Sequence, residues 1–126
     1  MNRIIYEDNH LIAVTKRSGE IVQGDKTGDK PLSEEIKSYL KTKYKKPGNV
    51  FLGTIHRLDR PTSGIVLFAK TSKSLSRMNE LFKNKKVQKT YYAVTEDKPN
   101  KEKGVIISSL KKNQKQNKSY ITKLDN

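Results

Sequence analysis

The sequence is poor in the residues that build most covalent or metal-dependent sites. It contains no cysteine and only two histidines, His10 and His56, which lie far apart along the chain. The absence of cysteine excludes disulfide bridges, thiolate zinc sites and cysteine nucleophiles within these residues. Two separated histidines are too few for the usual sets of metal ligands, so no metal site is expected.

Apolar residues are also scarce. They make up 33% of the 126 residues, and aromatic residues make up 7%. No apolar run approaches the roughly 18 residues of a membrane span and no signal peptide opens the chain, so we expect a cytoplasmic protein without membrane contact. The apolar residues that are present fall in clusters, which is enough for one small domain over residues 1–126.

Positive charge, by contrast, is abundant and unevenly distributed. Lysine and arginine number 27 against 13 acidic residues, a net charge of +14, and residues 65–126 hold 15 of the basic but only 5 of the acidic side chains. Such an excess favours a polyanion such as a nucleic acid through counterion release. The alternative is a solvated, lysine-rich surface, and charge alone does not separate the two. A membrane surface fits less well, because no basic amphipathic helix carries a broad apolar face.

Periodicity and turn residues predict an α+β fold. One apolar stripe at helical spacing follows Pro31, and a second follows Thr71 or Ser72, either of which can cap a helix. We therefore expect two helices, near 31–45 and 72–84, packed on a mainly antiparallel mixed sheet. The strands predicted from β-rich runs between turn residues are Arg3–Tyr6, Leu11–Thr15, Val50–Ile55, a central buried strand at Ile65–Ala69, Thr90–Thr95, Gly104–Ser109 and Ser119–Thr122.

The segment from His56 to Gly64 is the most distinctive part of the chain. It is turn-rich and cationic, it lies between two apolar runs, and it places Asp59 between Arg57 and Arg60. A carboxylate flanked by guanidinium groups is expected to have a lowered pKa and to stay ionised. The arginines could at the same time hold phosphates, which indicates an enzyme acting on a nucleic acid. The alternative is that Asp59 only caps a turn or pairs with Arg60.

Three blocks of the sequence resemble the RluA-type pseudouridine synthases. Residues 56–64 carry the HRLD-x-x-TSG signature of that family, residues 6–14 (YEDNHLIAV) are similar to its N-terminal block, and residues 87–94 (VQKTYYAV) to its K-x-Y-x-A-x-V strand. The resemblance implies a catalytic domain that isomerises uridine in RNA. It would break the N1–C1′ bond, turn the uracil and rejoin it through C5, without a cofactor or metal.

The same resemblance assigns roles to single residues. Asp59 matches the catalytic aspartate, which either stabilises or traps charge at C1′ or abstracts a ribose proton to form a glycal; the sequence leaves both open. Tyr91 matches the tyrosine that stacks on the target base, and alternation along a strand would turn Tyr92 to the other face. Arg57 would fill the space left by the flipped base or hold its phosphate. The other residues predicted to bind RNA or substrate are His56, which would also order the loop by hydrogen bonding, and Arg60, Thr62 and Lys89.

Two departures from the family pattern bear on function. The family's Lys-Pro-x-Gly turn reads Lys16-Arg17-Ser18-Gly19 here, without the proline. The family's C-terminal block, whose basic residue pairs with the catalytic aspartate, has no counterpart. We therefore expect a domain that is incomplete at its C-terminal end and weakly active or inactive alone. The alternative functions are a non-catalytic basic RNA-binding relative and a small basic ribosome-associated or structural protein. The target stays open between ribosomal RNA and tRNA, and a monomer is favoured.

Overall fold

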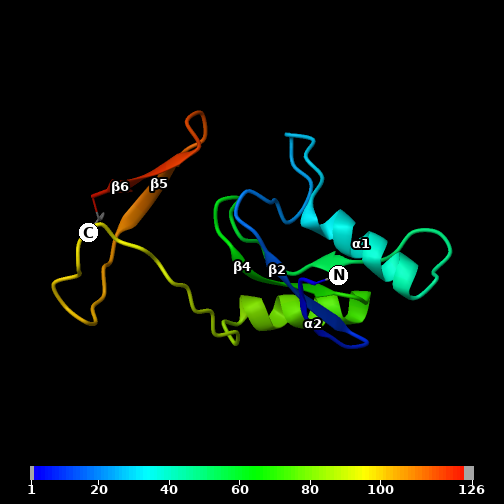
Figure 1. Ribbon diagram of the computed structural model, residues 1–126. Helices are drawn as coiled ribbons and strands as arrows, with labels where there is room; N and C mark the ends of the chain where they lie inside the picture. Colours follow the sequence, from blue (N-terminus) through cyan, green and yellow to red (C-terminus); the bar gives the residue numbers. More distant parts are fainter. Residues whose placement is uncertain (1, 124–126) are drawn as a thin grey trace. The chain divides into compact units, whose positions relative to one another are not determined.

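The computed structural model describes residues 2–123 and divides the chain into two compact units, Met1–Lys89 and Thr90–Asn126. The first unit holds a four-stranded sheet and two helices, and the second holds a two-stranded sheet (Figure 1). All strand pairs are antiparallel. The α+β fold is therefore confirmed, whereas one domain over residues 1–126 stays a prediction.

The sheet of the first unit has the strand order β1-β2-β4-β3. Its strands are β1 (Ile4–Glu7), β2 (Leu11–Lys16), β3 (Gly53–Thr54) and β4 (Gly64–Ala69). The predicted hairpin is β1–β2, and β4 lies inside the sheet between β2 and β3, as the sequence indicated. The predicted strand Val50–Ile55 is wrong in length, because only two of its residues pair with the end of β4 and Phe51 is exposed.

One face of this sheet carries the core. Ile12 pairs with Phe68 and Val14 with Val66, and all four side chains are fully buried. Helix α1 (Leu32–Lys43) covers them with its apolar stripe, which consists of Leu32, Ile36 and Leu40. The helical spacing read from the sequence therefore marks the side of α1 that faces the sheet.

The opposite face is covered by helix α2 (Ser72–Lys83), but only in part. The register places Gly53 and Ala69 on this second face, and a Cβ at Gly53 would lie 2.8 Å from the Leu75 side chain of α2. Figure 1 shows the two helices on opposite sides of the sheet. Ile65, also on the second face, stays 60% exposed, so β4 is central but not buried on both faces as its apolar run predicted.

Helix α2 is capped at both ends, whereas α1 begins after Pro31 without a side-chain cap. Thr71 caps α2 through a capping box with Ser74, which confirms the predicted N-cap. Both helices end in the same way: Lys45 and Lys85 adopt positive φ, and the amides of Lys46 and Lys86 bond back to the carbonyls of residues 41 and 81. These are Schellman motifs with lysine at the position that glycine prefers.

The second unit is a hairpin of β5 (Ser109–Asn113) and β6 (Lys118–Thr122). The strand predicted near 119–122 is confirmed. The strand predicted at Gly104–Ser109 is wrong, since pairing begins only at Ser109. Turn chemistry explains the shift: the Asn113 side chain accepts two amides of the turn, and Asn117 adopts positive φ.

The strand predicted at Thr90–Thr95 is also wrong. Within residues 2–123 this run pairs with no other strand, and Tyr92 and Val94 are fully exposed. β-rich composition describes side chains that fit a sheet, but a strand also needs a partner for its backbone groups.

Candidate active site

The loop that follows β3 alternates between anchored and exposed side chains. His56 and Leu58 point inward, whereas Arg57 and Asp59 are exposed. The His56 Nε2 accepts a hydrogen bond from the Leu67 amide at 3.0 Å, and its ring stacks on Phe82 with the centroids 5.2 Å apart. Leu58 packs against the core. Every second residue of the signature therefore anchors the loop to the first unit, and the residues between them are exposed to solvent.

Asp59 stands at the first position of a tight turn. The Thr62 amide donates to the Asp59 carbonyl at 2.9 Å, with Arg60 and Pro61 between them. Within the part of the chain that the structure describes, Asp59 joins no ion pair, because the nearby Arg60 pairs with other carboxylates. The reading in which Asp59 only neutralises Arg60 is therefore wrong.

Lys16 holds the backbone of this turn, a role that the sequence analysis did not predict. The side chain is fully buried at the end of β2, and its Nζ shares its three N–H donors among four backbone carbonyls within hydrogen-bond distance. They belong to Arg17 (3.1 Å), Asp59 (3.1 Å), Arg60 (2.9 Å) and Thr62 (2.6 Å). Burial lowers the pKa of Lys16. The signal that could have found it is alternation along β2, which places Lys16 on the same face as Ile12 and Val14.

Arg60 ties a second loop to the turn. Its guanidinium Nη1 lies 3.0 Å from Asp29 Oδ2 and donates to the Gly19 carbonyl at 3.1 Å, and its Nη2 lies 3.6 Å from Asp25 Oδ2. The Gly19 amide donates in return to the Arg60 carbonyl at 2.8 Å. RNA binding by Arg60 stays a prediction, and it would compete with these contacts.

Lys89 approaches the loop from the segment after α2. Its Nζ lies 5.9 Å from the centroid of the Phe82 ring, on which His56 stacks. Burial and then the charge of Lys89 lower the pKa of His56. A neutral ring is also what the hydrogen bond requires, because Nε2 accepts from Leu67.

Tyr91 belongs to the second unit, and Thr62 is half-buried in the turn of the first. Tyr91 is 60% exposed and Tyr92 fully exposed. The pairing of Tyr91 with Asp59 over one flipped base, and the binding roles of Arg57 and Thr62, stay predictions.

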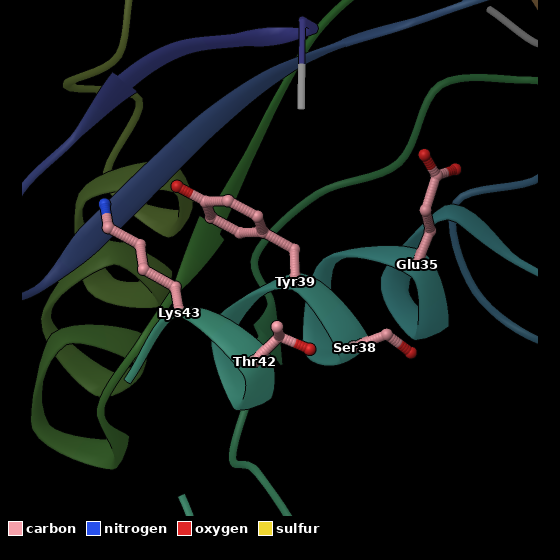
Figure 2. Close-up of a pocket in the computed structure, with 5 residues that line it drawn as sticks. All are labelled: Glu35, Ser38, Tyr39, Thr42 and Lys43. Atoms are coloured by element: carbon pink, nitrogen blue, oxygen red, sulfur yellow. The ribbon is translucent and has the colours of Figure 1, made fainter. Parts of the chain in front are cut away.

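A shallow, open hollow lies along α1. Glu35, Ser38, Tyr39, Thr42 and Lys43 line it. Figure 2 shows the polar ends of Tyr39 and Lys43 pointing the same way, and both donate to Glu7 Oε2. Burial opposes ionisation of Glu7, but hydrogen bonds from Lys43, Tyr44 and Lys70 lower its pKa to about 2. The phenol of Tyr39 and the ammonium of Lys43 are therefore already engaged by the Glu7 carboxylate.

Residues 2–123 contain no cluster of three or more potential metal-ligating side chains of the His, Cys, Asp and Glu types. None of the helices described is long and apolar enough to cross a membrane.

Comparison with known proteins gives consistent matches. Residues 10–126 match the family described as RNA pseudouridylate synthase. The ribosomal large subunit pseudouridine synthase C of Rickettsia felis is 42% identical over 109 residues, covering 86% of this chain and 34% of that protein. The protein of the same name from Rickettsia conorii is 40% identical over 122 residues, covering 97% of this chain and 38% of the relative. The chain thus spans about a third of the length of these relatives.

A solved structure supports the fold. Human RNA pseudouridylate synthase domain containing 4 superimposes with a TM-score of 0.57 at 22% identity, covering 68% of this chain and 31% of that one.

Proposed function

The chain belongs to the RNA pseudouridylate synthase family, and from this premise we propose that the protein isomerises uridine to pseudouridine in RNA, with Asp59 as the catalytic carboxylate. The observation that supports Asp59 is its setting. Its side chain is exposed and without an ion pair among the described residues, while the backbone around it is held by Lys16 and by the Thr62 amide. A mobile loop would have to be ordered at each turnover, whereas a fixed turn presents the carboxylate in advance.

The chemistry suits one carboxylate. Breaking the N1–C1′ bond of uridine develops positive charge at C1′, which an anionic oxygen can stabilise or trap. Abstraction of a ribose proton by the same carboxylate is the alternative route. Rejoining the uracil through C5 forms the C5–C1′ bond, releases the C5 proton and leaves N1 protonated. All atoms and electrons then balance, so the reaction needs no external oxidant, reductant or group donor.

Large-subunit ribosomal RNA is the substrate we propose, because the named relatives are ribosomal large subunit enzymes. Extrusion of the target base costs a few kcal/mol, and an aromatic platform lowers that cost. Arg57, exposed two residues before Asp59, would hold the extruded nucleotide, and Tyr91 would stack on its base. The protein would act in the cytoplasm as a monomer.

Tritium release from RNA labelled at C5 of uridine tests this proposal on the complete protein. Asp59→Asn should lower turnover by at least about 10³-fold while RNA binding changes little, because binding is shared among many cations. The control is Asp97→Asn, which removes the same charge from an exposed position of the second unit and should leave turnover unchanged. Undiminished turnover in Asp59→Asn would remove this residue from the mechanism. Binding without turnover by the wild type would favour the non-catalytic relative instead.

A further inference from the structure

The cations of the first unit divide into those that are paired and those that are not. Among residues 2–89, five basic side chains pair with carboxylates of the same unit, and they are Arg3, Lys37, Lys43, Arg60 and Lys70. A cation held in such a pair has less to gain from a phosphate, because it must first give up its partner. The net charge therefore overstates the surface that an RNA can use.

A group of unpaired cations follows the end of α2. Lys83, Lys85, Lys86 and Lys89, here called the α2 basic cluster, are all exposed, and none joins an ion pair among the described residues. Glu80 is the one acidic residue between positions 70 and 89 of the sequence. Four cations within seven residues can neutralise several successive phosphates of one strand.

The path of α2 brings this cluster to the Asp59 loop. At the start of the helix, the Ser74 hydroxyl donates to the His10 carbonyl at 2.9 Å, near the end of the sheet where β4 finishes. Two turns later, Phe82 stacks on His56, the first residue of the loop signature. Lys89 reaches back over the same Phe82 ring. The α2 basic cluster therefore adjoins His56 and, next to it, Arg57.

The end of α1 provides a natural contrast. Lys41, Lys45 and Lys46 form a similar group, with Lys45 at the same left-handed position as Lys85. Beside them, Tyr44 donates to Glu7 at the end of β1, and its ring lies 4.9 Å from the Lys70 Nζ at the end of β4. Figure 1 shows the C-terminal end of α1 at one end of the sheet and the C-terminal end of α2 at the other. The two groups share composition and local geometry, and they differ in distance from Asp59.

We infer that the α2 basic cluster binds the phosphate backbone of the RNA strand that flanks the target uridine and leads it to the Asp59 loop. This inference rests on the proposed function for the identity of the partner. The stack of His56 on Phe82 couples the two parts, because one ring contacts both the loop and the helix that carries the lysines. Phosphate contacts of this kind set the register of the strand and leave base selection to the loop.

The test compares two triple variants of the complete protein, Lys83→Gln/Lys85→Gln/Lys86→Gln and the control Lys41→Gln/Lys45→Gln/Lys46→Gln. Both remove three charges from a helix end, including the lysine with positive φ, so the changes in net charge are matched. Binding to a labelled transcript of large-subunit ribosomal RNA is measured between 50 and 300 mM KCl. The logarithm of the association constant falls with the logarithm of the salt concentration. If all three lysines contact phosphates, the α2 variant should make this slope less steep by about 2 and weaken binding roughly 100-fold at 0.1 M. The control should change the slope by less than half as much.

Lysine acetylation with and without RNA gives a second readout on the wild type. Bound RNA should protect Lys83, Lys85 and Lys86 and leave Lys41, Lys45 and Lys46 reactive. Equal slopes for the two variants, or equal protection of the two groups, would overturn the inference and leave the proposed function standing. Absence of pseudouridine formation by the wild type would defeat the proposed function, whatever the binding data.

Discussion

Replacing Lys16 by methionine is the sharpest test of how the loop is built. Methionine keeps most of the aliphatic stem but removes the ammonium group, which serves four backbone carbonyls. A buried carbonyl that loses its donor costs about 1–3 kcal/mol. The costs do not add fully, because water enters and because the variant no longer buries a charge. We expect the free energy of unfolding to fall by about 2–4 kcal/mol, which a domain of typical stability survives.

The same substitution should affect catalysis through geometry. Three of the four carbonyls belong to residues 59–62, so their release lets the turn that carries Asp59 shift. A displacement of about 1 Å at a reacting group costs roughly 100-fold in rate. Single-turnover tritium release should therefore show a lower rate constant with little change in RNA affinity.

Urea unfolding of the same variant supplies the stability measurement. The control is Lys37→Met, which removes an exposed lysine paired with Glu34 and should cost less than about 0.5 kcal/mol. A Lys16→Met protein that unfolds and turns over like the wild type would refute the positioning role. Loss of RNA affinity with an unchanged rate would place Lys16 in binding instead.

Three further predictions concern stability. Burial and the charge of Lys89 lower the pKa of His56, so the neutral ring stabilises the fold above about pH 6.5 and this stability is lost as the pH falls. Urea unfolding between pH 5 and 8 should show a free energy of unfolding that rises with pH, and His56→Gln should reduce this dependence. Glu7→Gln should lower the free energy of unfolding by about 2 kcal/mol, since Lys70 loses its carboxylate. In the wild type this contribution should persist down to about pH 4.5 and fade as the pH falls toward the Glu7 pKa of about 2. Acid unfolding curves that coincide for both proteins would contradict this prediction. Lys85→Gly should stabilise the chain by about 0.5–1 kcal/mol because its φ is 53°, and a lower melting temperature in calorimetry would contradict that reading.

Local signals in the sequence were sufficient for the helices and for part of the sheet. Thr71 caps α2 through contacts within one turn, and the apolar stripe of α1 needs only its own spacing to show which side is buried. The strand predicted at Thr90–Thr95 is wrong because a strand needs a pairing partner, which the residues of the run do not specify. The segment 109–113 was missed for the opposite reason, since the turn at Asn113 sets the pairing although the strand is largely polar.

The loop signature predicts Asp59 as the catalytic residue, but it does not show which side chains hold the backbone of the turn. The sequence offers Asp59 or an RNA phosphate as partners of Arg60, whereas Asp25 and Asp29, more than 30 positions away, pair with it in the structure. The sequence places Lys16 in the turn Lys16-Arg17-Ser18-Gly19 and gives no sign of its burial, because lysine is almost never fully buried. The two cases have one origin: a charge is assigned to the surface unless its partners are known, and these partners are distant in sequence.

The burial of Lys16 also bears on when the loop becomes ordered during folding. Lys16 and Thr62 are 46 residues apart in sequence, so their contact closes a long chain segment and cannot form from local structure alone. Lys16 occupies the last position of β2 and pairs with Gly64, so the ammonium reaches the turn when β2 and β4 pair at this end of the ladder. The turn around Asp59 should therefore gain protection from amide hydrogen exchange together with the central strands, in one cooperative step, and not as an independent late event.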